Sequence, residues 1–464
     1  MKRGCFWRKF FIMVVKNLWD DAKAANAEDI LWGEVTQQAL QCSSLGAPKV
    51  PQAFLRIIAL VKYACAKANA NLACIDKEKA EVIQAIALDI YEGKWAENFP
   101  LEIFQSGGCT PTHMNLNEVI AGVAGKYKAT NIHPNDDCNY GQSTNDVIPT
   151  TLNIAIREGV KQELLPALEL CRKVLEEKEN DWSEIAILGR THTMDAVPMT
   201  LGQVFSGYRR QLEKNIESIQ HNLERFLELP IGGTAVGNGL NCHPDFGSQV
   251  VQVLNQELQE NYSLSKNRFE QQSSRDDYVF FAGLLDTLAT TLIKISNDIR
   301  WYGSGPAGGL NELILQKTHA GSSCMPGKVN PVVCETLLQA CIYVQGHCDS
   351  IRRCAVIGGQ FQLNTTSMLL IYAVLDSIRT VSKSVNLFTE FVLEGLQANY
   401  DKIKEHLTDS CAQLTALVPL IGYDLAAEVV QKARMDNSSL LAFIKEKCPN
   451  LAEETIKKVL DVLG

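Results

Sequence analysis

The chain has 464 residues, with 44 Lys and Arg against 53 Asp and Glu, which gives a formal net charge of −9. This acidic balance argues against a nucleic-acid-binding protein, because phosphate recognition uses a basic surface. No uninterrupted run of about 18 apolar residues occurs, so we expect no membrane-spanning helix. The 15 cysteines are odd in number and form no closely spaced pairs. They predict free thiols in a reducing compartment and no structural zinc site.

The first segment, residues 1–16, contains five basic residues and no acidic ones. Such a segment is typical either of a targeting peptide or of a loosely docked tail. Its apolar run, residues 10–15, is short for a signal peptide. We therefore expect residues 1–30 to form a tail of a cytoplasmic protein. A transit peptide, and with it a mitochondrial matrix location, is the alternative.

Long helices dominate the expected secondary structure. No proline lies between Pro244 and Pro306 or between Pro331 and Pro419, and an interior proline costs a helix about 3 kcal/mol. Apolar residues recur at steps of three or four along three stretches, as the buried faces of bundled helices require. These stripes are Phe205, Tyr208, Leu212, Ile216, Ile219 and Leu223; Leu285, Leu288, Leu292, Ile295 and Ile299; and Ile371, Val374, Ile378, Val381, Val385, Phe388 and Val392. The spacing predicts an all-α protein.

Polar and glycine-rich stretches interrupt the helical pattern. They occupy residues 105–118, 133–146, 189–203, 232–246 and 321–331. Dense polar loops are typical either of exposed turns or of segments that converge on a site. Their composition leaves both interpretations open.

The stretch at residues 321–331 combines two serines, a lysine and an asparagine with flanking glycines. Glycine allows backbone dihedrals that point several N–H groups at one anion. Ser322 and Ser323, with Lys328 and Asn330, therefore suit the binding of a carboxylate. A mobile surface loop is equally compatible with this composition.

Similar hydrogen-bonding side chains occur in other polar stretches. Thr191 and His192 place a hydroxyl beside a group that can transfer a proton near neutral pH, although a structural histidine fits as well. Thr110 and residues 143–145 offer neutral groups that can bind a carboxylate without a buried unpaired charge. The alternative is helix capping, because Ser, Thr and Asn are preferred caps and apolar runs follow.

Together these stretches are similar to the signature segments of the aspartase/fumarase superfamily. Residues 321–331 read Gly-Ser-Ser-Cys-Met-Pro-Gly-Lys-Val-Asn-Pro, and the other stretches resemble the remaining segments in the same order. The resemblance implies an all-α subunit of three domains, at residues 31–145, 146–395 and 396–464. Its long central helices would build the bundle of a homotetramer, and each active site would take loops from three subunits.

The resemblance also implies the reaction, a reversible anti-elimination from a four-carbon dicarboxylate to give fumarate. Ser322 would be the catalytic base, with His192 and its acidic partner Glu335 as the other catalytic residues. The substrate-binding residues would be Thr110, Ser143, Thr144, Asn145, Thr191, Ser323, Lys328 and Asn330. No organic cofactor and no metal is expected, since no G-x-G-x-x-G follows an expected strand and neither a Walker loop nor an H-E-x-x-H motif occurs in the sequence.

Two activities within the family compete. The segments that look aspartase-like are residues 142–146, 195–199, 309–312, 330–333 and 359–364. Those that look fumarase-like are residues 133–137, 232–237 and 243–244. The comparison favours elimination of ammonia from L-aspartate, as in aspartate ammonia-lyase, with class II fumarate hydratase as the alternative.

Three positions depart from the family pattern. Cys109, His113 and Ala307 stand where Gly, Asn and Arg are usual. They motivate a third and less favoured hypothesis, a non-catalytic structural homologue that shares only the fold.

Overall fold

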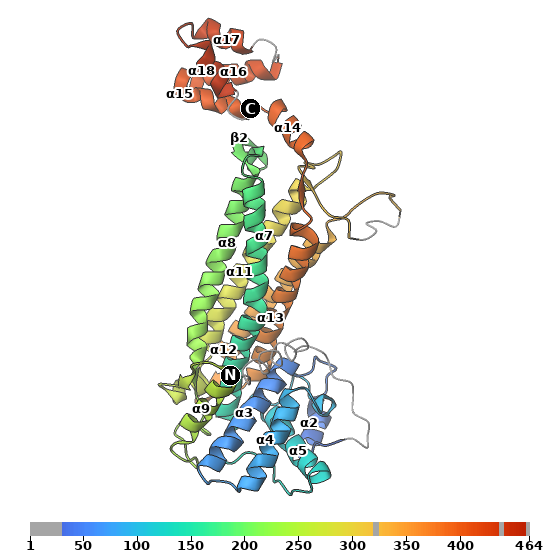
Figure 1. The fold of residues 1–464 in the computed structure, drawn as a ribbon, viewed down its shortest axis with the longest axis vertical. Coiled ribbons are helices and arrows are strands. Elements are labelled where there is room, and N and C mark those ends of the chain that lie inside the picture. The colour runs from blue at the N-terminus through green and yellow to red at the C-terminus, as the bar shows by residue number, and fades with distance from the viewer. Residues whose placement is uncertain (1–29, 319–323, 436–439, 461–464) are drawn as a thin grey trace, which may run out of the picture. The chain divides into compact units, whose positions relative to one another are not determined.

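The computed structural model describes residues 30–318, 324–435 and 440–460. Helices make up most of this part of the chain, and the strands are short and pair two by two (Figure 1). The predicted all-α class is therefore confirmed. The predicted tail lies almost entirely in residues 1–29, outside the described part. The predicted domain boundaries after residues 145 and 395 stay predictions.

The chain divides into two compact units. The first comprises Met1–Ala167, Asn215–Thr290 and Ala340–Lys383, and the second comprises Leu168–Lys214, Thr291–Gln339 and Ser384–Gly464. Five long helices contain a unit boundary: α7 (Leu165–Asp181), α8 (Leu201–Asn222), α11 (Asp276–Tyr302), α12 (Val332–Gly358) and α13 (Ser367–Phe388).

The first unit contains the α-helices α2 (Glu34–Ser43), α3 (Gln52–Asn71), α4 (Lys77–Tyr91), α5 (Thr110–Tyr127), α6 (Thr144–Gly159), α9 (Phe246–Leu258) and α10 (Arg268–Ser273). α3 packs against α4, α6 and α9. The shorter helical elements are η2 (Ala96–Asn98), η3 (Val160–Leu164) and η4 (Leu223–Leu227). Strand β3 (Glu228–Leu229) pairs in parallel with β4 (Ser263–Leu264), and β6 (Gly359–Gln360) pairs antiparallel with β7 (Leu363–Asn364).

The second unit contains two antiparallel strand pairs, β1 (Ala186–Thr191) with β2 (Met194–Thr200) and β5 (Leu313–Ile314) with β8 (Gln397–Ala398). Its helical elements are η5 (Thr389–Leu393), α14 (Tyr400–Asp409), η6 (Ala412–Leu417), α15 (Val418–Ile421), α16 (Tyr423–Met435), α17 (Leu440–Lys447) and α18 (Glu453–Leu460). β1 contacts α14, and β2 contacts η6.

The three predicted apolar stripes are confirmed as buried faces. They lie on α8 and η4, on α11, and on α13 and η5, and every member is at most 5% exposed. Full burial of an aliphatic or aromatic side chain contributes about 1.5–3 kcal/mol. Spacing in the sequence thus identified the faces around which these helices pack.

Helix α11 is long and apolar enough to cross a membrane by length and composition alone, with a window of mean hydropathy 1.5. It passes this test although Asp286 and Lys294 interrupt its apolar residues. The core helix of a water-soluble protein passes the same test, and the buried stripe of Leu285, Leu288 and Leu292 accounts for the composition of α11.

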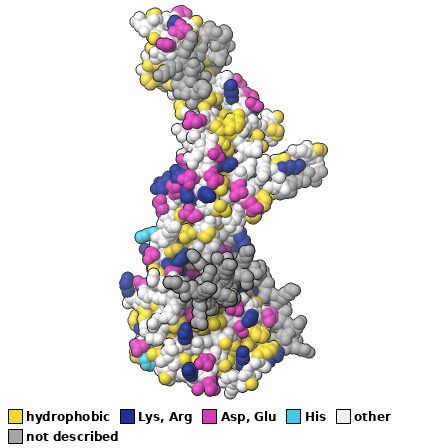
Figure 2. Space-filling view, viewed as in Figure 1, with side chains coloured by type: hydrophobic (Ala, Val, Ile, Leu, Met, Phe, Trp, Pro, Cys, Tyr) yellow, Lys and Arg dark blue, Asp and Glu magenta, His cyan; other side chains and the backbone are white. Residues whose placement is uncertain are grey.

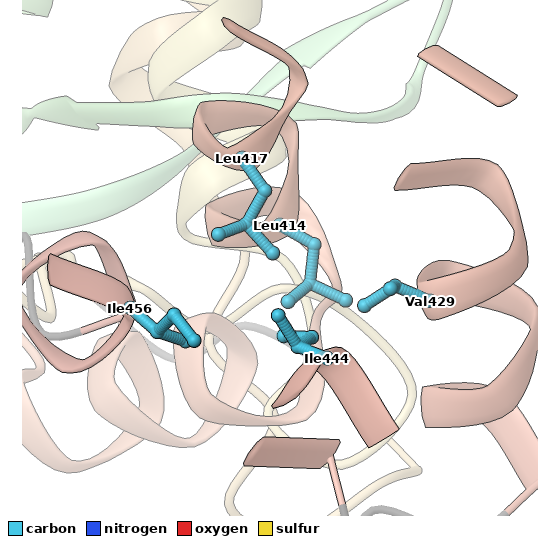
Figure 3. Packing of buried hydrophobic residues seen from close by; sticks show 5 residues of the cluster. All are labelled: Leu414, Leu417, Val429, Ile444 and Ile456. Carbon is cyan, nitrogen blue, oxygen red and sulfur yellow. The ribbon is translucent and has the colours of Figure 1, made fainter. Parts of the chain in front are cut away.

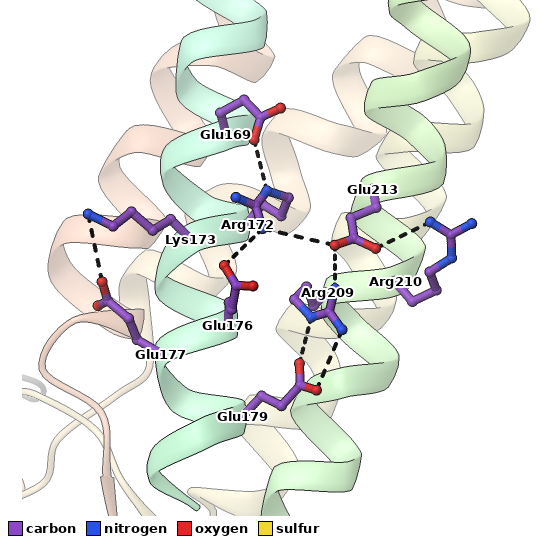
Figure 4. Close-up of polar contacts among 9 residues, drawn as sticks. All are labelled: Glu169, Arg172, Lys173, Glu176, Glu177, Glu179, Arg209, Arg210 and Glu213. Carbon is purple, nitrogen blue, oxygen red and sulfur yellow. Dashed lines mark hydrogen bonds and ion pairs between the residues drawn. The ribbon is translucent and has the colours of Figure 1, made fainter.

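Ion pairs connect α7 and α8 within the second unit (Figure 4). Arg209 on α8 donates from Nε to Glu179 Oε2 on α7 at 2.6 Å, and Arg172 Nη1 on α7 lies 3.9 Å from Glu213 Oε1. All four side chains are partly exposed, so each pair contributes little to stability. On the face shown in Figure 2, acidic and basic side chains are interspersed.

The last part of the second unit has a small core of its own. Leu414, Leu417, Val429, Ile444 and Ile456 point toward one another from η6, α16, α17 and α18 (Figure 3). Helices this short do not persist alone in water. Their packing around this cluster therefore holds the segment together.

Replacement of Leu417 by alanine should destabilise this segment by about 2–5 kcal/mol, because it leaves a cavity in a closed core. Leu420→Ala is the matched control: Leu420 is 42% exposed, whereas Leu417 is fully buried. Hydrogen exchange of residues 411–460 measures both effects. Equal losses of protection in the two variants would contradict the described packing.

Candidate active site

Helix capping, the alternative considered for residues 143–145, is confirmed at the start of α6. Ser143 is the N-cap, and its side chain and that of Asp146 form a reciprocal capping box. Thr144 and Asn145, the first two residues of the helix, are half-buried. Asn145 Nδ2 donates to the backbone oxygen of Ala235 at 2.8 Å. Three predicted substrate-binding residues thus surround a helix N-terminus, where N–H groups and the helix dipole favour an anion.

A fully buried carboxylate, that of Asp146, fixes this arrangement. Its Oδ1 accepts from Ser143 N at 3.0 Å, and its Oδ2 accepts from Gly232 N at 3.0 Å and Thr234 N at 2.9 Å. Burial raises the pKa of Asp146 to about 6, against the opposing effect of these N–H donors. One side chain therefore joins the start of α6 to the glycine-rich segment at residues 232–246.

A buried lysine supports the loop that leads into α6. Lys62 on α3 is fully buried and donates from Nζ to Cys138 O at 3.2 Å, Asn139 Oδ1 at 3.1 Å and Gln142 Oε1 at 2.7 Å. Burial lowers the pKa of Lys62 to about 8. Sequence reasoning missed this residue, although a single charge within the apolar run of residues 57–66 was the available signal.

Two of the three positions that depart from the family pattern, Cys109 and His113, lie at the start of α5. Thr110, predicted to bind substrate, is the first residue of α5 and is exposed. Cys109 before it is buried with φ of 67°, the left-handed region that favours glycine, which gives a physical reason for the usual Gly. His113 is fully buried, and its Nδ1 lies 2.9 Å from Thr144 Oγ1. This contact links α5 to the start of α6.

A cavity of about 660 Å³ lies beside residues 135–141, in the loop that leads into α6. It is lined by Asn135, Asp136 and Asn139 from residues 133–146 and by Cys242 and His243 from residues 232–246. Among the described residues, no three His, Cys, Asp or Glu side chains gather closely enough to hold a metal ion.

In the second unit, residues 189–203 contain a β-hairpin where the sequence predicted only a polar interruption. β1 and β2 pair Arg190 with Asp195 and Thr191 with Met194, so His192 and Thr193 form the two-residue turn. Both turn residues have positive φ, 55° and 62°, as a tight hairpin turn requires. Short strands with few apolar positions leave no alternating pattern to detect. The hairpin presents Thr191 and His192 as exposed side chains at its tip.

A buried network holds the base of this hairpin. Arg190 forms two bonds to Glu312, from Nη1 to Oε2 at 2.9 Å and from Nη2 to Oε1 at 2.6 Å. His406 Nδ1 on α14 lies 2.7 Å from the same Oε1, and Glu312 is 1% exposed. Bidentate charge-assisted pairs are strong and directional. Arg190, Glu312 and His406 are therefore positioning residues for the tip, and all three were absent from the predicted site.

The other predicted residues of the second unit lie around the start of α12. Lys328 is exposed, Asn330 is half-buried, and Glu335 lies on the first turn of α12. Glu335 Oε1 lies 3.7 Å from Arg300 Nη2. Within the described chain, no hydrogen bond or ion pair joins Glu335 to His192, so the pairing of these two residues stays a prediction.

Two predicted residues, Ser322 and Ser323, lie outside the described residues. The remaining departure from the family pattern, Ala307, is exposed in the second unit. The described site residues thus form two groups, one in each unit: Thr110, Ser143, Thr144 and Asn145 in the first, and Thr191, His192, Lys328, Asn330 and Glu335 in the second.

A model of a family described as lyases matches residues 22–346. Fumarate hydratase class II of Nitrosomonas europaea is 40% identical over 416 residues, which are 88% of this chain and 90% of that protein. Its counterpart in Thermosynechococcus vestitus is 42% identical over 418 residues, 89% of each chain. The chain belongs to the aspartase/fumarase superfamily of lyases.

Solved structures agree with this family. The crystal structure of recombinant class II fumarase from Schistosoma mansoni matches with a TM-score of 0.89 and 30% identity, covering 95% of this chain and 98% of that one. A fumarate lyase:delta crystallin from Brucella melitensis bound to cobalt matches with a TM-score of 0.87 and 33% identity. The lyase fold implied by the sequence motifs is thus confirmed over nearly the whole chain.

Lys62 gives the lyase a distinct dependence of stability on pH. Because its native pKa is about 8 and its ordinary value is 10.5, the unfolded chain binds more protons between these values. The free energy of unfolding contributed by Lys62 then rises with pH, by up to about 3 kcal/mol. The difference between wild type and Lys62→Met, measured by urea unfolding from pH 8 to 10.5, should therefore increase.

Lys77→Met is the control, because Lys77 is largely exposed on the same unit. Its difference from wild type should stay flat over the same range. A flat difference for Lys62→Met as well would show that the Lys62 amine is not desolvated.

Proposed function

We propose that this lyase is a class II fumarate hydratase, which interconverts L-malate with fumarate and water. The observation that carries the proposal is identity of about 40% to proteins named fumarate hydratase class II over 88–94% of the chain. The fold agrees, since the class II fumarase from Schistosoma mansoni aligns with nearly every residue.

The aspartate reading favoured by the motif comparison gives way to its alternative. That comparison weighed residues such as Thr144, where fumarases usually have Ser. Thr144 Oγ1 lies 2.9 Å from His113 Nδ1, so the residue type at position 144 also bears on packing beside that histidine. Few of the compared positions would contact the leaving group, so they discriminate poorly between loss of ammonia and loss of water.

The proposed mechanism assigns proton removal to Ser322, on the carbon next to one carboxylate of malate. Negative charge then collects on that carboxylate, which Lys328 and Asn330 would hold, while hydroxide leaves from the neighbouring carbon with a proton supplied by a water or by His192. A serine hydroxyl is a weak base at neutral pH, so the cation and N–H donors must stabilise its oxyanion. The α6 N-terminus, with Ser143, Thr144 and Asn145, suits the second carboxylate.

The proposed working form is a homotetramer. Exposed apolar side chains on α12 support self-association: Ile342 is 62% exposed, Val356 75% and Ile357 68%. Covering such side chains is favourable. The exposed hairpin tip with His192 also fits a residue that completes the site of another subunit.

Turnover of L-malate to fumarate tests the proposal directly. Fumarate absorbance should rise with L-malate and stay flat with L-aspartate. Ser322→Ala should lower kcat by about 1,000-fold because it removes the base, with circular dichroism and gel filtration unchanged. Cys324→Ser is the control for a change in the same loop.

Production of fumarate from L-aspartate alone would restore the ammonia-lyase reading. A well-folded tetramer that turned over neither substrate would instead favour the non-catalytic homologue.

Mixing two inactive variants tests whether sites are shared between subunits. Ser322→Ala and His192→Asn alter different loops, so some sites in mixed tetramers would combine an intact copy of each. Co-refolding the two should restore measurable malate turnover, whereas each variant refolded alone should not. Mixtures as inactive as the separate variants would indicate that each site is built within one subunit.

A further inference from the structure

His113 is a buried polar side chain placed directly behind a proposed substrate-binding group. It projects from α5, is fully buried, and its Nδ1 lies 2.9 Å from Thr144 Oγ1 at the start of α6. Thr144 itself is half-buried, and its hydroxyl contacts the histidine at the start of the helix. The state of His113 therefore decides what Thr144 can offer to a ligand.

The imidazole of His113 is neutral. Burial and the nearby charge of Lys62 lower the pKa of His113 well below its ordinary value of 6.5. A neutral imidazole carries one N–H and one bare nitrogen. Two tautomers are therefore available. In one of them Nδ1 accepts a hydrogen bond from Thr144, and in the other Nδ1 donates one to it.

With the proton on Nε2, bare Nδ1 accepts the Thr144 hydroxyl hydrogen, and only lone pairs remain for the ligand. With the proton on Nδ1, His113 donates to Thr144 Oγ1, and the hydroxyl hydrogen is free. An ionised carboxylate only accepts hydrogen bonds. Recognition of a dicarboxylate through Thr144 therefore requires the Nδ1–H tautomer.

The surroundings of Nε2 favour the same tautomer. Among the described residues, His113 Nε2 is buried without a hydrogen-bond partner. A buried N–H without an acceptor is rarer in proteins than an acceptor without a donor.

We propose that His113 is a positioning residue that donates from Nδ1 to Thr144 and so directs the Thr144 hydroxyl hydrogen to a substrate carboxylate. The inference rests on the proposed function, because it takes Thr144 as part of the dicarboxylate site. It also explains how the usual Asn can be replaced here, since the Asn side-chain amide carries an N–H donor at nearly the same place as Nδ1.

Two conservative variants separate the ring nitrogens. His113→Asn keeps a donor near Nδ1, whereas His113→Gln places its amide near Nε2. Binding of succinate, an unreactive four-carbon dicarboxylate, is measured by calorimetry. We expect His113→Gln to weaken binding by about tenfold and His113→Asn to stay within a factor of about three. Circular dichroism and gel filtration check the fold, and His113→Leu replaces the Gln variant if that variant does not fold.

A double-mutant cycle shows whether His113 acts through Thr144. Thr144→Val keeps the shape and removes the hydroxyl. In that background His113→Gln should weaken succinate binding further by less than a factor of about two. Equal losses in both backgrounds, or a loss in His113→Asn as large as in His113→Gln, would overturn the proposal.

The tautomer can be observed directly. Nitrogen-15 NMR of histidine-labelled protein, with His113→Asn identifying the His113 signals, should show Nδ1 protonated and Nε2 bare. Protonated Nε2 would overturn the proposal.

Failure of the proposed function gives a different result. If wild-type protein binds succinate but turns over neither malate nor aspartate, the hydratase proposal is wrong. The double-mutant cycle on succinate binding would still test the role of His113. Wild-type protein that does not bind succinate would overturn the inference about His113.

Discussion

The first half of the candidate site depends on one buried carboxylate. Asp146 accepts from backbone N–H groups of Ser143, Gly232 and Thr234, and so fixes the start of α6 against a segment 86 residues further along the chain. Burial of a carboxylate is costly unless its lone pairs are filled. Backbone donors fill them here, and the raised pKa of Asp146 shows that part of the cost remains.

The same principle recurs in the second unit with a full ion pair. Glu312 is buried, and its two carboxylate oxygens accept hydrogen bonds from Arg190. His406 Nδ1 also contacts one of these oxygens, Oε1. Arg190 lies one residue before Thr191, and the turn that follows, at His192 and Thr193, has positive φ values that residues other than glycine adopt at a cost. Anchoring the strand at Arg190 lets an exposed tip keep a defined shape. Each unit thus holds its proposed binding residues by burying a carboxylate behind them.

The sequence motifs identified the family of this protein, but they did not identify its substrate. The motif at residues 321–331 and its companions identified the superfamily, which the family model and the related proteins confirm. The choice between ammonia and water as leaving group did not follow from the same residues. Thr144 looked like a marker of the aspartase activity, but its side chain is matched to His113. A residue type carries functional meaning only when its neighbours in space are known.

What the sequence by itself determined was local. Steps of three and four placed Leu285, Leu288 and Leu292 on one face of α11 because a helix repeats every 3.6 residues, and residues 143–145 were recognisable as possible helix caps. Tertiary structure decided that Lys62 supports the loop before α6, that His113 meets Thr144, and that Glu312 holds the hairpin. These contacts join residues 31 to 122 positions apart. These contacts depend on how whole helices pack, and the spacing of residues along the chain does not predict them.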